Sequence, residues 1–107
     1  MGIKLGEIYL VEVSSAEGDV TSERPCIILS NWESRHNPKT ISVVPLSAAP
    51  NEFSSQNVYV RSSGLPRKIA LCGHCFIIDK SKIRSGPLCR LSSSDLNDVE
   101  LGVLDEN

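Results

Sequence analysis

The sequence lacks several features that would assign it at once to a class of protein. No apolar run approaches the roughly 18 residues that a membrane-spanning helix needs, and residues 1–15 show no signal-peptide pattern. We therefore expect a cytoplasmic protein with no membrane segment. The 107 residues include only one Trp, two Tyr and two Phe, and these are scattered. Such a chain does not offer the clustered aromatic side chains that grip proline-rich peptides.

The composition is that of a single ordered domain. Hydrophobic residues make up 40% of the chain and charged residues 22%, with a net charge of -2. This balance supports one modest core over residues 1–107 and argues against disorder. Six prolines, seven glycines and sixteen serines predict many turns, which disfavours a helical bundle.

Short apolar runs, rich in β-branched residues, predict six or seven strands. We place them at about residues 6–13, 26–29, 40–44, 56–61 and 88–91, with one long or two short strands within 68–78. Pro25 is expected to open the second strand and Pro45 to close the third. Residues 14–24 read as a loop, and residues 85–87 (SGP) as a turn.

The C-terminal segment changes its hydrophobic period. Leu96, Val99 and Val103 follow one another at helical spacing after three serines that can cap a helix. A short C-terminal helix is therefore expected. Short strands at regular spacing followed by this helix predict a mainly β fold, a small barrel or sandwich.

Charge is distributed unevenly along the chain. Residues 61–90 carry seven Lys or Arg against one Asp, whereas residues 91–107 carry five acidic residues and no basic one. The basic segment is compatible with an anionic ligand. A solvated strand face explains the same charges, and on charge alone it is the favoured interpretation.

Four cysteines allow three interpretations. Residues 72–75 (CGHC) match the motif of disulfide isomerases, but that chemistry needs a thiol at a helix N-terminus, and the flanking residues are strand-like. A zinc site would have to recruit the isolated Cys26 and Cys89. The third interpretation is reduced thiols in an ordinary core. We expect the third, with no metal and no cofactor.

An ordered set of segments resembles a known family. The set comprises residues 6–9 (GEIY), 24–31 (RPCIILSN), 43–47 (VVPLS) and 70–83, which end in a basic turn. This order is similar to that of the MazF/PemK (Kid) toxin family of type II toxin–antitoxin systems, over nearly the whole chain. No single motif is specific; their order carries the resemblance.

The resemblance implies a fold, an activity and partners. The family fold is an SH3-like barrel with a C-terminal helix, usually as a homodimer. Its usual activity is metal-independent, sequence-selective cleavage of single-stranded RNA, and a cognate antitoxin protein binds it. The functional Arg and Thr of the family correspond to Arg24 and Ser47. An acidic residue in the first loop of the family corresponds only loosely to Asp19 or Glu17.

The residue types suit this chemistry on independent grounds. Arg is always protonated and offers a planar fork of donors to phosphoryl oxygens, and a Ser hydroxyl can donate to one of them. Without the resemblance, Arg24 would read as an exposed loop cation and Ser47 as an ordinary loop serine. Expected RNA-binding residues, besides Asp19, are Arg61, Arg67, Lys68, His74, Lys80, Lys82 and Arg84.

Two other function classes remain open. A gyrase-poisoning toxin of the related CcdB type would bind a protein and cut nothing, but its C-terminal tail carries bulky aromatic residues that this tail lacks. A non-catalytic SH3-like binding module is the other class. The chain also departs from the MazF/PemK pattern at His74-Cys75, where an acidic residue and Gln are usual. This departure touches the expected dimer interface and groove.

Overall fold

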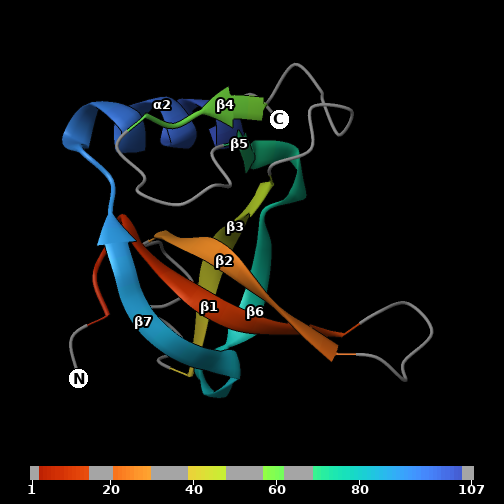
Figure 1. Cartoon of the computed structure of the whole chain (residues 1–107). Coiled ribbons are helices and arrows are strands. Elements are labelled where there is room, and N and C mark those ends of the chain that lie inside the picture. Colours follow the sequence, from red (N-terminus) through yellow and green to blue (C-terminus); the bar gives the residue numbers. More distant parts are fainter. Residues whose placement is uncertain (1–2, 15–20, 30–38, 48–56, 62–68, 105–107) are drawn as a thin grey trace.

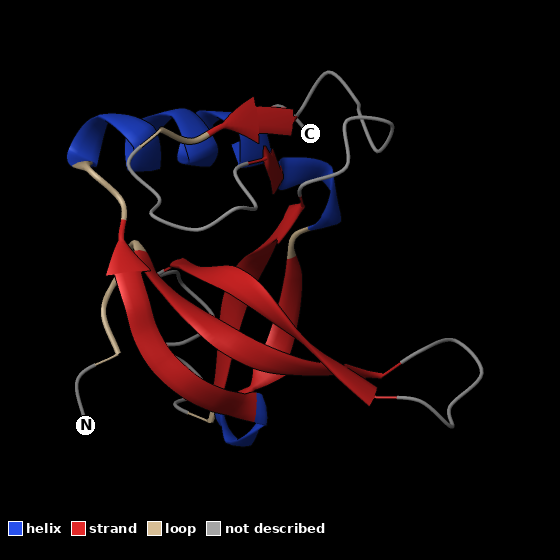
Figure 2. Cartoon of the chain, in the orientation of Figure 1, coloured by secondary structure: helices blue, strands red, loops and turns tan. Residues whose placement is uncertain are grey.

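The structure is a computed structural model that describes residues 3–14, 21–29, 39–47, 57–61 and 69–104. Within these ranges, seven strands, two 3₁₀ turns and one helix follow in the order β1 (Glu7–Ser14), β2 (Thr21–Leu29), β3 (Thr40–Ser47), β4 (Asn57–Tyr59), β5 (Ile69–Leu71), η1 (Cys72–His74), β6 (Phe76–Asp79), η2 (Lys80–Lys82), β7 (Ile83–Arg90) and α2 (Ser93–Leu104). The predicted mainly β fold with a C-terminal helix is confirmed. Figure 1 labels these elements, and Figure 2 shows the helix at one end of the strands.

The seven strands form one antiparallel, barrel-like sheet. Its order is β4-β5-β3-β2-β1-β7, and β6 pairs with β3 on the side that β2 does not occupy. Along that side β3 changes partner, from β6 over residues 40–43 to β5 at residues 46–47. No pairing among the described strands joins β7 to β6 or to β4. The sheet therefore curves strongly without closing.

Side-chain alternation builds a core on each face of the central strands. On β2, Ile27 and Leu29 belong to one buried cluster, which α2 covers through Val99, whereas Cys26 and Ile28 belong to a second cluster with Val11 and Val43. The four consecutive apolar residues of β2 are thus buried on both faces. The sequence predicted this burial from the lack of alternation in that run.

Three predicted boundaries are wrong, and all of them involve proline. Strand β2 begins at Thr21 and runs through Pro25, β3 continues past Pro45 to Ser47, and β7 contains residues 85–87, which were predicted to form a turn. The β1–β7 pairing shifts register near residue 85, where Gly86 has a φ of +139°. A Cβ on Gly86 would lie 2.7 Å from the Tyr9 ring. The register shift is a β-bulge, which allows these residues to remain part of the strand.

A buried carboxylate joins the helix to the end of β4. The main-chain N–H of Asp95 donates to Ser92 Oγ at 3.2 Å, as in an N-terminal helix cap. The Asp95 side chain, only 8% exposed, accepts the main-chain N–H of Arg61 at 2.9 Å. The predicted capping by serine is therefore confirmed, and Asp95 has an additional role in tertiary structure. None of the described helices is long and apolar enough to span a membrane.

Replacing Asp95 by alanine should destabilise the fold. The Arg61 N–H would lose its acceptor in a partly buried site, which costs about 1–3 kcal/mol of unfolding free energy. Urea denaturation of Asp95→Ala beside Asp98→Ala measures this cost, since Asp98 is exposed on the same helix and its removal should change stability by less than about 0.5 kcal/mol. Equal losses in the two variants would contradict the assigned role of Asp95.

Candidate active site

Strands β2 and β3 bring Arg24 and Ser47 together. Their antiparallel register ends at the pair Cys26 and Pro45, and two further residues in the same register place Arg24 opposite Ser47. Directly opposed residues present their side chains on the same face of a sheet. The Arg24 side chain also reaches the main chain beside Ser47, because its Nη2 donates to the Leu46 carbonyl at 3.4 Å. Residues 23 positions apart in the sequence thus form one site.

Arg24 retains an unused donor. Its side chain is half-buried, and its Nε is fully buried with no hydrogen-bond partner among the described residues. Leaving a buried donor unpaired costs about 1–3 kcal/mol, and more for a charged group. Native structures seldom keep such a group without a function. Because the Arg24 side chain as a whole is only half-buried, its guanidinium can still offer N–H groups to the oxygens of an anionic ligand.

Ser47 is the last residue of β3 and is only 3% exposed. It was predicted to lie in a loop, but it pairs with Ile69 of β5 at the point where β3 has left β6. A residue at the end of a paired strand is held more firmly than a loop residue. The sheet therefore holds Ser47 directly after Leu46, the residue whose carbonyl accepts from Arg24.

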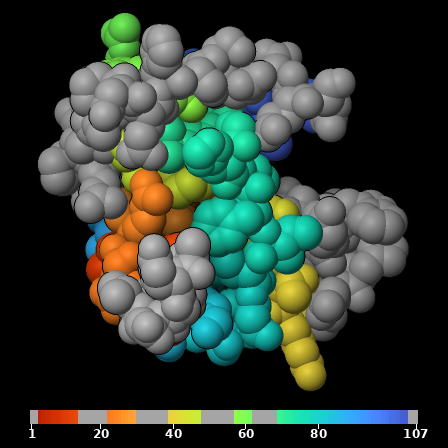
Figure 3. All heavy atoms as spheres, turned by 90° about the vertical axis from the view of Figure 1, so that its right-hand side faces the viewer, coloured from red at the N-terminus to blue at the C-terminus, as the bar shows by residue number. Residues whose placement is uncertain are grey.

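Cys26 lies two residues from Arg24, on the same face of β2. Burial raises the pKa of its thiol to about 12, and the positive charge of Arg24 opposes this rise only in part. The thiol is consequently neutral at physiological pH. It does not neutralise Arg24, and it is a poor nucleophile in this state. Figure 3 shows a face of the molecule on which parts of β2 (orange) and β6 (teal) both reach the surface.

The four cysteines do not converge on one site. Cys26 belongs to one core cluster, whereas Cys72, Cys75 and Cys89 lie in or against the other, on the opposite face of the sheet. All four are free thiols, and Cys72 donates to the Val99 carbonyl at 3.5 Å within the core. The CGHC motif forms a 3₁₀ turn followed by β6. Within the described ranges, no three His, Cys, Asp or Glu residues form a group that could hold a metal ion.

Two of the predicted RNA-binding cations are paired within the protein. Arg84 forms a hydrogen-bonded ion pair with Glu12, and Lys82 Nζ lies 3.9 Å from the same carboxylate. Val11 opposes both Arg24 and Ile83, so these three share a face. Glu12, Lys82 and Arg84, which flank Val11 and Ile83 in the sequence, point to the other face. This ion cluster is therefore separated from Arg24 by the thickness of the sheet.

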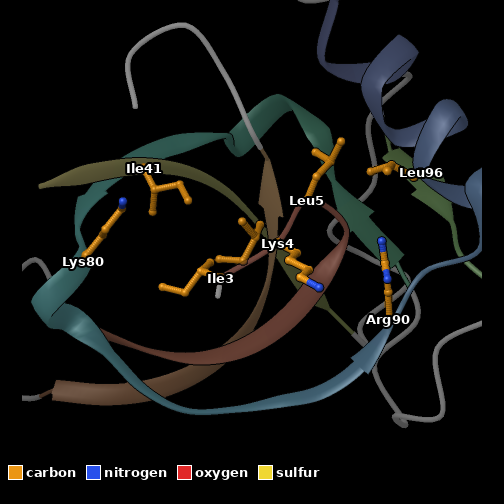
Figure 4. A pocket seen from close by; sticks show the side chains of 8 residues that line it. Ile3, Lys4, Leu5, Ile41, Lys80, Arg90 and Leu96 are labelled. Carbon is orange, nitrogen blue, oxygen red and sulfur yellow. The ribbon is translucent and has the colours of Figure 1, made fainter. Parts of the chain in front are cut away.

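Lys80 lies at the far end of the Cys26 core. It lines a surface cavity of about 410 Å³, together with Ile3 and Ile41. Figure 4 shows Lys80 beside Ile41, and Arg90 on the opposite side of the same cavity. The main-chain N–H of Lys80 donates to the Lys39 carbonyl at 2.8 Å. Lys80 also lines a second surface cavity together with Arg84, so it lies near the Glu12 cluster.

The remaining predicted residues are dispersed. Arg61 is exposed just beyond β4, and His74 is exposed at the end of η1. Asp19, Glu17, Arg67 and Lys68 lie outside the described residues. The sequence did not indicate Glu12 as the partner of Lys82 and Arg84. The alternation of Val11, Glu12 and Val13 indicates only that the Glu12 side chain faces away from the two valines.

Comparisons with known proteins identify the family of the chain. The sequence profile of the PemK-like, MazF-like toxins of type II toxin–antitoxin systems matches residues 4–105. The chain belongs to this family. It is therefore a toxin of the MazF kind from a type II toxin–antitoxin system. No curated protein sequence matches the chain.

Solved structures share the fold of this MazF-like toxin at low sequence identity. An endoribonuclease from a mycobacterial species, in complex with its cognate antitoxin, is 11% identical, with a TM-score of 0.78 and coverage of 98% of this chain and 94% of that one. MazF from Deinococcus radiodurans is 16% identical, with a TM-score of 0.77 and coverage of 98% and 96%. The toxin MazF-mt6 of Mycobacterium tuberculosis is 16% identical, with a TM-score of 0.71 and coverage of 94% of each chain.

The raised pKa of Cys26 predicts how the stability of this toxin changes in alkali. Below pH 9, the unperturbed value, the thiol is protonated in both states. Between pH 9 and about 12 only the unfolded chain ionises, so stability falls, by up to about 1.4 kcal/mol per pH unit from this group. In urea denaturation under reducing conditions, the stability difference between the parent and Cys26→Ala should shrink from pH 8.5 to 10.5.

The matched control for this prediction is Ile28→Val, which changes the same core cluster without removing an ionisable group. Its stability difference from the parent should stay constant over the same pH range. A difference for Cys26→Ala that is equally constant would show that the thiol ionises alike in the folded and unfolded chains.

Proposed function

We propose that this toxin is a metal-independent, sequence-selective endoribonuclease that cleaves single-stranded RNA. The observation that carries the proposal is the half-buried Arg24 guanidinium, which is held at the Leu46 carbonyl, next to Ser47, and has a further donor, Nε, without a partner among the described residues. A fixed cation with an unused donor suits a phosphoryl group. Ser47, from the facing strand, adds a hydroxyl at the same place.

The proposed reaction is transesterification within the RNA strand. The ribose 2′-oxygen attacks the adjacent phosphorus and loses its proton, while the bond to the 5′-oxygen of the next nucleotide breaks and that oxygen gains a proton. The products are a 2′,3′-cyclic phosphate and a 5′-hydroxyl. Negative charge grows on the non-bridging oxygens as the nucleophile attacks. A preorganised donor aimed at this charge contributes about 3–4 kcal/mol, or roughly 10²–10³-fold in rate.

Arg24 and Ser47 have complementary roles in this reaction. The Arg24 guanidinium binds the phosphoryl oxygens and stabilises their charge in the transition state. The Ser47 hydroxyl donates a hydrogen bond to one of them. Because both residues belong to paired strands, little reorganisation is needed when the substrate binds. The Cys26 thiol remains neutral beside them and takes no part.

The other cations are proposed to hold the RNA backbone outside the reacting group. Arg61, His74 and Lys80 remain available on separate parts of the surface. Lys82 and Arg84 lie on the opposite face from Arg24, so they can contact RNA only where it extends past that face. There the RNA phosphates compete with the Glu12 carboxylate for these two cations. Asp19, Arg67 and Lys68 complete the proposed set of RNA-binding residues.

A cognate antitoxin and a second copy of the chain are the proposed protein partners, in the cytoplasm. Structures of related toxins with their antitoxins, from a mycobacterial species and from Deinococcus radiodurans, motivate the first. The resemblance to a family of homodimers motivates the second. Large apolar side chains that a partner could cover are exposed on β4, β6, β7 and α2, namely Tyr59, Ile77, Leu88, Leu101 and Leu104.

The proposed chemistry predicts a specific set of products. Purified toxin should cleave a long single-stranded RNA in the presence of EDTA, and the new 3′ ends should carry a cyclic phosphate. RNA with a 2′-deoxyribose at the scissile nucleotide should resist, because the attacking oxygen is missing. End-group analysis by mass spectrometry checks both points. Cleavage that strictly requires a divalent metal would rule out this mechanism.

Arg24 should act on the rate of cleavage rather than on RNA affinity. We expect Arg24→Ala to lower the single-turnover rate by about 10²–10³-fold while the Kd for uncleavable RNA changes by less than about twofold. Arg24→Lys should restore little, since an ammonium group is a point charge without the planar fork. Circular dichroism must first show that the variants fold as the parent does.

The comparison variants are Lys80→Ala and Lys82→Ala. If these lysines bind phosphates, each variant should bind all RNA sequences more weakly, and the slope of log K against log salt should fall by about 0.7. Their single-turnover rates at saturating enzyme should remain close to that of the parent. A loss confined to affinity in Arg24→Ala would instead place Arg24 among these positioning cations.

A further inference from the structure

Pro25 interrupts the hydrogen bonding of β2 on one side only. Toward β1 the pairing is continuous, from Ile8 and Ile27 through Leu10 and Pro25 to the end of the hairpin. Toward β3 the pairing runs from Leu29 back to Cys26 and does not include Pro25. A central strand seldom contains proline, because proline has no N–H to donate to a neighbour. The one-sided interruption indicates that β3, and not β1, is the strand that receives no hydrogen bond from residue 25.

The direction of the β2 main chain confirms this assignment. Residues of a strand alternately point their N–H and C=O groups toward one neighbour and then the other. The Ile28 carbonyl accepts the N–H of Gly6, next to β1, at 2.9 Å. Cys26 and Arg24 therefore also face β1 with their main-chain groups. Ile27 and Pro25 face β3.

The β3 residue opposite Pro25 is Leu46. The register that pairs Cys26 with Pro45 places Leu46 one residue further along, across from Pro25. Any other residue at position 25 would therefore donate its N–H to the Leu46 carbonyl. This is the carbonyl to which Arg24 Nη2 donates, at 3.4 Å. The guanidinium thus occupies the position that a main-chain N–H would otherwise take.

We propose that Pro25 is a positioning residue for Arg24. By withholding an N–H from the Leu46 carbonyl, it leaves this acceptor to anchor the guanidinium next to Ser47. The inference rests on the proposed ribonuclease function for its kinetic consequences. The anchoring itself is independent of what substrate the site takes.

The anchor has a clear physical benefit. A free arginine side chain has several rotatable bonds, and fixing it costs rotamer entropy. Holding one Nη at a main-chain carbonyl of the rigid sheet meets this cost before substrate binds. It also aims the remaining donors, Nε among them, at one place. A misplacement of about 1 Å in such a site can lower the rate about 10²-fold.

The structural arm of the test uses Pro25→Ala. Its new main-chain N–H should bond to the Leu46 carbonyl, detectable by NMR as a scalar coupling across the hydrogen bond between the nitrogen at position 25 and the Leu46 carbonyl carbon. The Arg24 side-chain ¹⁵N signals should move in parallel, because Nη2 loses its acceptor. Neither signal depends on RNA or on activity.

The matched control is Pro45→Ala. Because Leu46 faces β2, Pro45 faces the other side, where β3 changes its partner from β6 to β5. An N–H at position 45 therefore cannot reach the Leu46 carbonyl. The Arg24 ¹⁵N signals and the cleavage rate of this variant should remain those of the parent, within about threefold for the rate.

The kinetic arm separates the missing N–H from the proline ring. Pro25→Ala should lower the single-turnover rate by about 10- to 100-fold and leave RNA affinity within about twofold of the parent. Replacement of Pro25 by lactic acid, introduced by codon suppression, gives an ester that lacks both the ring and the N–H. This ester variant should recover most of the parent rate, although it loses the same ring contacts as the alanine variant.

Each outcome decides the proposal. An alanine variant without the coupling to Leu46, or with unchanged Arg24 signals, would overturn it, as would an ester variant as slow as the alanine variant. If the parent cleaves no RNA, the proposed function fails, and the NMR arm alone still tests the anchor. If the anchor is absent but the parent cleaves RNA, only the positioning role of Pro25 fails.

Discussion

The burial of β2 on both faces is the constraint on which the site depends. Ile27 and Leu29 pack toward the helix, and Cys26 and Ile28 pack into the opposite core. A strand held from both sides cannot rotate or slide by one residue without moving polar side chains into one core or the other. Arg24 comes where the buried run begins, so its place and the face it shares with Ser47 follow from packing on the rest of the strand.

The strongest expectations from the sequence concerned packing. The run of four apolar residues after Pro25 predicted a strand buried on both faces, and the helical spacing of Leu96, Val99 and Val103 predicted the terminal helix; both are confirmed. The errors lie at prolines. A strand tolerates proline where the neighbouring strand on that side can do without the main-chain N–H that proline does not have. That neighbour is set by sheet order and register, which local composition does not reveal.

The candidate site was only partly predictable. Family resemblance indicated Arg24 and Ser47, and the sheet brings them together. The pairing of Glu12 with Arg84 could not be predicted, because these residues are 72 positions apart and the β1–β7 register shifts between them. The excess of positive charge in residues 61–90 likewise suggested one basic surface. In the structure, Lys82 and Arg84 both pair with Glu12, and Lys80 lines a cavity together with Arg84, whereas Arg61 lies at Asp95 of the helix. A linear charge count therefore missed both the separation of Arg61 and the charge that Glu12 offsets.

The separation of Arg24 from the Glu12 ion cluster has an evolutionary consequence. Neighbouring positions of a strand, such as Glu23 and Arg24, face different surroundings, so selection acts on them almost independently. Mutations on the Glu12 side can change the outer charge, while the side chains on the Arg24 side keep their places. A single layer of main chain thus separates two surfaces that can be altered one at a time.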